Sequence, residues 1–238
     1  MYGKDVESLG TILGVWAHPD DETYLSAGIM AAAVASGSRV VCVTATRGEE
    51  GSPDHDRWPP AEMGAVREGE LMDALAILGV TEHHWLDYHD GACASVPAGE
   101  ATRKIANIIE TVKPDSVLTF GPEGMTGHPD HIAVSKWATA AVSRSAAPGA
   151  RLLYATTNPD WAKRFVPPLE ALNVYAPGTP PITPTDELAI HLPLDGNLAE
   201  KKFRAIGAQV SQVQWLLAAV GEELFRAAIA QENFRPAP

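Results

Sequence analysis

The sequence predicts an α/β protein, a Rossmann-like three-layer α/β/α sandwich with a mostly parallel sheet. Along most of the 238 residues, short apolar runs alternate with longer stretches that have helical patterning. The run RVVCVTA at 39–45 is almost continuous in apolar residues, which is typical of a parallel strand buried on both faces. Strands and helices that alternate at this spacing favour a parallel sheet covered by helices on both sides.

The first half of the chain supplies the clearest elements. The apolar run GTILGVW at 10–16 predicts a buried first strand. A helix over 22–36 follows and ends at a glycine, which is a common helix stop. After the second strand at 39–45, a polar loop rich in turn-forming residues leads to a helix over about 61–78, which also ends at a glycine.

The middle of the chain continues the alternation. We expect a short strand at 82–86 and a helix over 98–112, which Pro114 prevents from extending further. The run DSVLTF at 115–120 predicts the next strand, and a helix follows over about 130–143. These elements add a third and a fourth strand to the predicted sheet.

The last third is less regular. A strand is expected at 151–155, and the proline-rich segment 166–186 is expected to be an irregular insertion. A strand near 188–194 and helices across 197–231 complete the pattern. Because strand and helix patterning resumes after the insertion, and no internal repeat is present, we predict a single domain that spans 1–238.

Composition excludes several classes of protein. The formal net charge is −12 and the pI is about 5.0, so an acidic surface would repel the phosphates of nucleic acid. The two cysteines, Cys42 and Cys93, form neither a disulfide framework nor a zinc knuckle. The N-terminal residues lack the apolar core of a signal peptide, and no apolar stretch approaches the ~18 residues of a membrane span. We expect a cytoplasmic protein that binds a small molecule, and the sequence leaves its oligomeric state, a homo-oligomer included, undetermined.

Two similar motifs carry most of the ionisable residues of interest. AHPDDE at 17–22 follows the first predicted strand directly, and GHPDH at 127–131 precedes a later helix. Two further polar loops, TRGEEG at 46–51 and DYHDG at 87–91, follow the second and third strands. Ligands of open α/β sheets bind at the carboxyl ends of the strands, so these four loops are expected to converge on one site.

The residues of the two motifs suit metal chemistry. His18 and Asp21 are three residues apart at a helix start, so both side chains can face one point. One of His128 and His131 can add a nitrogen ligand, which gives a three-ligand site with an open position. Asp20 would then be free to act as a general base. Alternatively, the aspartates are only helix caps, but two His-Pro-Asp loops at the same sheet edge have no evident structural purpose.

The two motifs, in this order, resemble those of the LmbE-like/PIG-L family of zinc-dependent N-acetylglucosaminyl deacetylases, which includes deacetylases and amidases of mycothiol and bacillithiol metabolism. The resemblance extends over about residues 10–140. It includes three further segments: TRGEEGS, REGELMDALAILGV and LDYHDG. The resemblance implies the deacetylase fold and a zinc ion as cofactor, although iron(II), cobalt or manganese can occupy the same kind of ligands.

The resemblance also implies roles for particular residues. The zinc ligands would be His18, Asp21 and His131. Asp20 would be the general base that deprotonates the metal-bound water. His128 would be the charged partner that stabilises the oxyanion or protonates the leaving amine.

Further residues are implied around this centre. Arg67 would bind substrate near the acetyl group, and Asp90 would contact sugar hydroxyls. Asp130 is expected to orient His128 or His18 through a ring N–H. The chain departs from the family at two positions. Thr126 stands where some sugar-thiol deacetylases have a tyrosine, and Gln209 stands at the histidine position of the segment KFRAIGAQVSQ.

The function expected from these features is zinc-dependent removal of an N-acetyl group from an N-acetylglucosamine-type sugar conjugate. An alternative is an amidase that cleaves a larger sugar-thiol conjugate. An alternative of another class is a non-catalytic metal- or nucleotide-binding module. The nucleotide form of that alternative is weak, because neither G-x-G-x-x-G nor G-x-x-x-x-G-K-[ST] follows any predicted strand.

Overall fold

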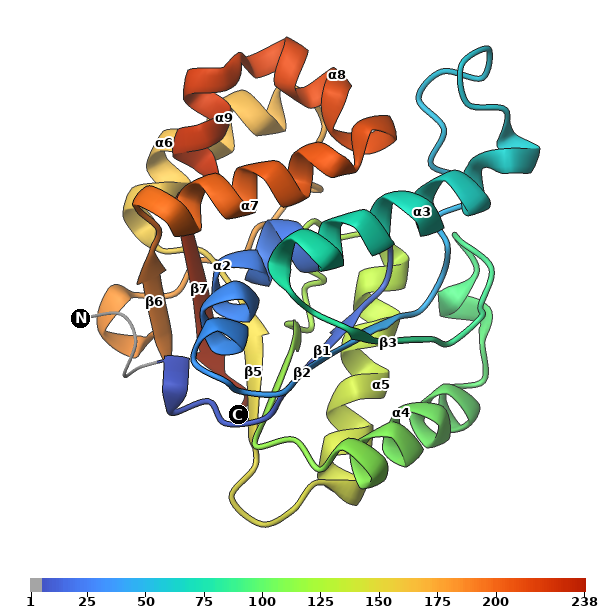
Figure 1. Cartoon of the computed structure of the whole chain (residues 1–238), viewed down its shortest axis with the longest axis vertical. Helices are drawn as coiled ribbons and strands as arrows, with labels where there is room; N and C mark the ends of the chain where they lie inside the picture. The colour runs from blue at the N-terminus through green and yellow to red at the C-terminus, as the bar shows by residue number, and fades with distance from the viewer. Residues whose placement is uncertain (1–5) are drawn as a thin grey trace.

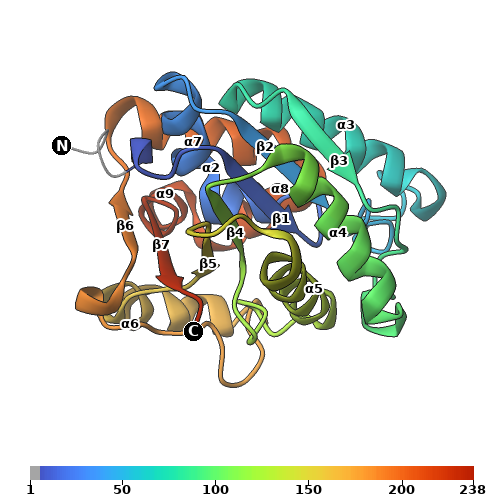
Figure 2. The same cartoon turned by 90° about the horizontal axis from the view of Figure 1, so that it is seen from below.

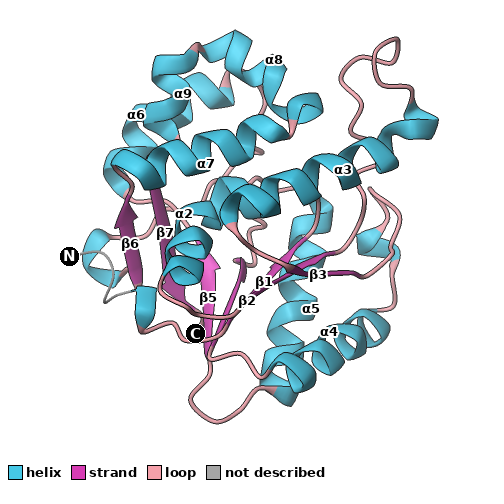
Figure 3. Ribbon diagram, in the orientation of Figure 1, coloured by secondary structure: helices cyan, strands magenta, loops and turns pink. Residues whose placement is uncertain are grey.

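The computed structural model describes residues 6–238, which form one mixed β-sheet between layers of helices (Figures 1 and 3). Its strand order is β3-β2-β1-β4-β5-β7-β6, and β1 to β5 run parallel while β7 is antiparallel to both of its neighbours. The strands are β1 (Ile12–Trp16), β2 (Val40–Thr44), β3 (Glu82–Trp85), β4 (Ser116–Phe120), β5 (Arg151–Ala155), β6 (Ile190–Pro193) and β7 (Gln231–Pro236).

Helices cover both faces of this sheet. On one face α2, α3 and α7 pack together, and on the other α4 packs against α5 (Figure 2). The remaining helices, α6, α8 and α9, gather at the top of Figure 1, beyond the carboxyl end of β5. The helices are α2 (Asp21–Ala35), α3 (Pro60–Leu78), α4 (Ala98–Val112), α5 (Pro129–Ser145), α6 (Pro159–Glu170), α7 (Gly196–Ala208), α8 (Val210–Val220) and α9 (Glu222–Ala228).

Burial explains why the inner strands are so apolar. Every residue of β1, β2 and β4 is buried, because helices cover both faces of these strands. The edge strand β3 is only partly buried and carries the polar sequence EHHW. The predicted fold class, a three-layer sandwich with a mostly parallel sheet, is therefore confirmed. No helix within residues 6–238 is both long and apolar enough to cross a lipid bilayer.

The central position of β1 in the sheet creates a place where a ligand can bind. After β1 the chain continues outward to β2 and β3 and then returns to β4 on the other side of β1, so the strand order reverses at β1. In open α/β sheets the carboxyl end of such a strand borders a crevice where ligands bind. AHPDDE begins at this point, directly after Trp16.

The expectation of an irregular segment over 166–186 is wrong in its first part, because residues 166–170 belong to α6. Two adjacent prolines predicted a break in any helix there. The helix nevertheless has a good start, since the side chain of Asn158 accepts a hydrogen bond from the Trp161 N–H at 2.8 Å. Its buried side chains recur every four residues: Trp161, Phe165 and Leu169. Packing of this apolar face offsets the prolines.

Strand β7 was not predicted at all; only α7, α8 and α9 correspond to the helices expected across 197–231. The buried centre of β7 is Glu232, Asn233 and Phe234, and two of these three residues are polar, so neither alternation nor an apolar run marks the strand. Glu232 is buried because its carboxylate pairs with Lys202 of α7 at 2.9 Å.

This buried ion pair also contacts α2. The carboxylate of Glu232 accepts the backbone N–H groups of Gly28 and Ile29 at 2.7 and 2.8 Å. The ammonium group of Lys202 donates to the carbonyl of Tyr24 at 2.7 Å. Side chains from α7 and β7 therefore replace or supplement backbone hydrogen bonds in the helix that follows AHPDDE, and they fix its position on the sheet.

Candidate active site

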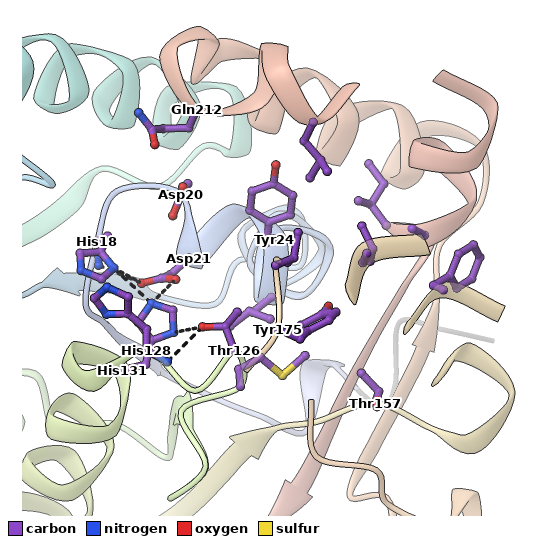
Figure 4. A pocket seen from close by; sticks show the side chains of 18 of the residues that line it. His18, Asp20, Asp21, Tyr24, Thr126, His128, His131, Thr157, Tyr175 and Gln212 are labelled. Carbon is purple, nitrogen blue, oxygen red and sulfur yellow. Dashed lines mark hydrogen bonds and ion pairs between the residues drawn. The ribbon is translucent and has the colours of Figure 1, made fainter. Parts of the chain in front are cut away.

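The four polar loops converge at the carboxyl ends of the parallel strands, as expected. All eight residues singled out in the sequence lie together there. Three of them, Arg67, Asp90 and Asp130, are engaged chiefly with other protein groups. The eight are His18, Asp20, Asp21, Arg67, Asp90, His128, Asp130 and His131. Figure 4 shows His18, Asp20, Asp21, His128 and His131 at one end of a cavity.

Three side chains of this group point donor atoms at one another. His18 Nδ1 lies 3.1 Å from His131 Nε2, and Asp21 oxygens lie 3.3 Å from His131 Nε2 and 3.7 Å from His18 Nδ1. Tetrahedral ligands at ~2.0–2.1 Å from zinc are separated by roughly 3.3 Å. The nearest atoms of the three side chains therefore have separations close to those of metal ligands, with a different Asp21 oxygen facing each histidine.

Hydrogen bonds on the far side of each ring fix the free nitrogens. His131 Nδ1 lies 2.9 Å from the carbonyl oxygen of Gly124, which can only accept, so this nitrogen carries the proton and Nε2 is left with a lone pair. His18 Nε2 lies 3.0 Å from Asp90 and 3.4 Å from Asp130, so it too carries a proton. Carboxylate or carbonyl partners of this kind are typical of histidines that bind a metal.

The electrostatics of this cluster favour a cation. Burial alone would lower the pKa of His18, but the carboxylates of Asp130, Asp90 and Asp21 outweigh it and raise that pKa to about 10. Burial and the neighbouring His18 and His128 hold the pKa of His131 well below its ordinary value. Without a metal, a proton on His18 Nδ1 provides the positive charge between the two rings. The donor set fits a divalent metal ion, which would take that proton's place.

Asp20 lies beside the three donors in a strained backbone conformation. Its φ is 115° and its ψ is −34°, which a residue other than glycine rarely adopts. Burial and the nearby Asp21 carboxylate raise the pKa of Asp20 to about 6, although the guanidinium of Arg67, 3.3 Å away, opposes the shift. A carboxylate with a pKa near neutrality is suited to accept a proton during a reaction.

Glu22 and Gln209 support Asp20 through a chain of hydrogen bonds. The sequence analysis did not assign a role to either residue. The fully buried carboxylate of Glu22 accepts the Asp20 N–H at 3.1 Å and the Gln209 side-chain amide at 2.7 Å. Gln209 in turn accepts the hydroxyl proton of Thr23 at 3.2 Å. Gln209, which stands at the family's histidine position, is therefore part of a buried hydrogen-bond network that supports Asp20, the candidate base.

Arg67 is more enclosed than a substrate-binding residue would need to be. It is 4% exposed, and its guanidinium donates to the carbonyl oxygens of Pro19 and Gly48 besides pairing with Asp20. A β-carbon on Gly48, whose φ is +68°, would lie 2.1 Å from Arg67 Nη1. The glycine of the TRGEEG loop thus permits the close approach that lets Arg67 hold the AHPDDE loop in place.

Asp90 and Asp130 both face His18. The bond to His18 lowers the pKa of Asp90 to about 2 despite its burial, and its other oxygen accepts the Glu50 N–H at 3.1 Å. Asp130 accepts the backbone N–H groups of Gly91 and Cys93 at 2.8 and 3.1 Å. Both carboxylates are thus engaged within the protein, which favours a role in orienting His18 over a contact of Asp90 with sugar hydroxyls.

His128 is the third histidine among the candidates, and one of its nitrogens also lies within 4.8 Å of a nitrogen of His18 and one of His131. Its Nδ1 accepts the backbone N–H of Asp130 at 3.2 Å and thereby caps α5. The proton of the neutral ring is therefore on Nε2, which makes that nitrogen a hydrogen-bond donor rather than a metal ligand. This geometry favours Asp21 over His128 as the third ligand.

The candidate ligands border a cavity of 580 Å³. The fold and the site together define the class of the protein: an α/β sandwich with a candidate metal centre at the carboxyl ends of its parallel strands. A family model described as PIG-L, GlcNAc-PI de-N-acetylase, matches residues 13–142, which include all eight site residues. The chain belongs to the PIG-L family and is an N-deacetylase of that family.

Relatives with full-length similarity carry one name. The chain is 31% identical to the "1D-myo-inositol 2-acetamido-2-deoxy-alpha-D-glucopyranoside deacetylase" of Saccharomonospora viridis, over 85% of each protein. It is 32% identical to the protein of the same name from Nakamurella multipartita, over 91% of this chain and 83% of the relative.

Solved structures show the same fold at lower identity. The N,N'-diacetylchitobiose deacetylase of Pyrococcus horikoshii has a TM-score of 0.67 at 22% identity, over 99% of this chain and 86% of that one. The 4-carboxy-2-hydroxymuconate hydratase of Pseudomonas putida has a TM-score of 0.62 at 17% identity, over 96% of each chain. Because this fold also carries a hydratase, the reaction has to be argued from the site and the family.

Proposed function

We propose that the chain is a zinc-dependent N-deacetylase that releases acetate and a free amine from an N-acetylglucosamine-type sugar conjugate. The observation that carries the proposal is the convergence of His18 Nδ1, His131 Nε2 and the Asp21 carboxylate beside a strained aspartate. The sugar is proposed from the relatives, whose printed names describe 2-acetamido-2-deoxy-glucopyranoside substrates.

The proposed ligands are His18, Asp21 and His131. Zinc held by these residues would polarise the amide carbonyl and make a water molecule more acidic. Asp20 lies next to the open position, where it can take the proton of the attacking water. The ion pair with Arg67 and the hydrogen bond from its own N–H to Glu22 keep the carboxylate aimed at that position.

His128 is proposed to stabilise the negative charge that develops on the amide oxygen. Its Nδ1 is occupied by the Asp130 N–H, so Nε2 is the donor available to the substrate. Removing one such donor from a comparable site costs ~10²–10³ in kcat. The neutral ring performs this role, whereas protonation of Nδ1 would break the cap of α5.

The proposal is tested by separating metal binding from turnover. Asp20→Asn should retain zinc but lose at least 10²-fold in kcat, because general-base catalysis typically contributes 10²–10⁴-fold. His18→Ala should lose the metal itself. The measurements are zinc content by atomic emission and amine release from methyl N-acetylglucosaminide. Asp73→Asn on the exposed side of α3 is the matched control. Near wild-type turnover by Asp20→Asn would rule out its role as the base.

The identity of the metal is tested with the same protein. Metal-free enzyme is reconstituted with zinc, iron(II), cobalt or manganese, since a site with two histidines and one aspartate accepts each of these ions. Zinc is expected to restore deacetylation. Activity with another ion and none with zinc would overturn the zinc assignment while leaving the ligand set intact.

A further inference from the structure

The cavity beside the metal-type ligands is much larger than an acetamide requires. It extends from His18 and His131 past Tyr24 and Tyr175 to the helices α6, α8 and α9 (Figure 4). Its volume of 580 Å³ is in the ~300–1,000 Å³ range of pockets that enclose small-molecule ligands. The end farthest from the metal site is built by the last third of the chain.

The walls of this far end are apolar. Its lining residues from the three helices and their ends are Trp161, Phe165, Pro168, Leu169, Trp215, Leu216, Val220, Leu224, Phe225, Ala228 and Ile229. None of these described residues is polar or charged. Gln212 of α8 also lines the cavity, but it lies near Asp20 (Figure 4) and donates its amide to the Gly51 carbonyl at 3.0 Å. A phosphate or carboxylate would find no basic partner on these helices.

Three polar side chains of the lining, Thr156, Thr157 and Asn233, are occupied by protein partners. Thr156 and Thr183 share a hydrogen bond of 2.8 Å, and Thr157 donates to the Pro181 carbonyl at 2.8 Å. Asn233 pairs with His191 at 2.6 Å. A hydroxyl-rich ligand placed there would exchange its bonds to water for few new ones, which is unfavourable.

The far end is a hollow in a hydrophobic cluster that is separate from the main core. Trp161, Phe165, Leu216 and Phe225 belong to this second cluster and also line the cavity. Protein interiors are normally close-packed, so an apolar hollow that opens onto a reaction site needs a ligand to fill it. Trp215 on α8 also lines the cavity and is 45% exposed, which provides an aromatic surface at its solvent side.

We propose that the substrate carries a large apolar group, alkyl or aryl, which occupies this hollow while the amide lies beside Asp20 and His128. The inference rests on the proposed deacetylation and adds the chemical class of the rest of the substrate. The apolar group is attached either through the sugar, with acetate released, or through the acyl carbon in place of the acetyl methyl, with a longer carboxylate released instead. Both attachments present the same apolar chemistry to the hollow. A conjugate whose second half is only a polyol would leave the hollow empty.

Binding tests the hollow without any turnover. Methyl, butyl and hexyl β-D-glucosides lack the amide, and their affinities for the zinc-loaded protein are measured by calorimetry. Each buried methylene contributes ~0.8 kcal/mol, or about fourfold in affinity. The hexyl glucoside should therefore bind at least tenfold more tightly than the methyl glucoside. Equal affinities across the series would overturn the inference, whatever the protein hydrolyses.

Hydrolysis distinguishes the two attachments. The hexyl glycoside of N-acetylglucosamine and the methyl glycoside of N-hexanoylglucosamine are each compared with methyl N-acetylglucosaminide in kcat/KM. A rise of tenfold or more with one of them supports the inference and identifies the attachment. No rise with either overturns it. If no amine is released from any of the three substrates but affinity still rises with the length of the alkyl chain, deacetylation is refuted while the binding of an apolar group in the hollow is supported.

Two variants test whether the apolar group binds in this hollow. Ala228→Phe places a ring in the hollow from α9 and should reduce the hexyl-to-methyl affinity ratio to about one. Ala219→Phe makes the same change on an exposed position of α8 outside the lining and should keep the wild-type ratio. Thermal unfolding checks that both variants fold. A wild-type ratio in folded Ala228→Phe would overturn the inference.

Discussion

Glu22→Ala should lower kcat by about 10- to 100-fold while zinc content and KM stay near wild-type values. The change removes the acceptor of the Asp20 N–H and of the Gln209 amide in a fully buried site. The strained backbone of Asp20 costs ~1–3 kcal/mol and persists only while its surroundings hold it. Burial and the nearby Asp20 raise the pKa of Glu22 to about 8, so its carboxyl is largely neutral near pH 7. A buried N–H that loses its acceptor costs ~1–3 kcal/mol, and each 1.4 kcal/mol corresponds to tenfold in rate.

The assay combines steady-state kinetics with zinc analysis and thermal unfolding. Glu22→Gln keeps an oxygen to accept the Asp20 N–H, so it should recover most of the lost kcat. Gln209→Ala leaves that acceptor in place and should have the smaller effect. If Glu22→Ala has wild-type kcat, or if its loss of activity follows a loss of zinc, Glu22 does not position Asp20 for catalysis.

Two further predictions concern stability and pH. Lys202→Met should lower the free energy of unfolding by ~3–5 kcal/mol, because it leaves the buried carboxylate of Glu232 unpaired. Denaturant unfolding measures this free energy. The double variant Lys202→Met/Glu232→Gln should recover part of the loss. A cost below 1 kcal/mol for Lys202→Met alone would contradict the argument. Zinc binding should release about one proton between pH 7 and 9, because carboxylates hold the pKa of metal-free His18 at about 10. Since the proton competes with the ion, zinc affinity should rise with pH up to about 10. Calorimetry in buffers of different ionisation enthalpy detects the released proton. A zinc affinity that does not change with pH in this range would refute the prediction.

The sequence was most informative where function depends on short segments. Strands β1, β2 and β4 are mostly apolar and buried throughout, and their order along the chain brings AHPDDE and GHPDH to one sheet edge. The structure brings the proposed ligands together at 3.1–3.7 Å. Their catalytic roles stay predictions until the variants are measured.

What the sequence did not reveal depends on contacts between distant segments. Gln209 reaches Glu22 across 187 residues, and no local pattern reports that a glutamine will face a buried carboxylate. The same holds for β7, in which Glu232 is buried only because Lys202 and the amides of α2 surround it. The apolar hollow also escaped sequence analysis, because the spacing of core residues in α6, α8 and α9 does not tell whether their apolar faces meet or leave a space.

The ion pair between Lys202 and Glu232 has a consequence for the order of folding. The bond from Gly28 to Glu232 spans 204 residues, so it forms only after the intervening chain has been arranged. His18, Asp21 and His131 all lie within residues 18–131 and need none of that later chain for their direct contacts. The contacts among these three residues can therefore form within residues 18–131, whereas α2 is secured to β7 only when the end of the chain is in place.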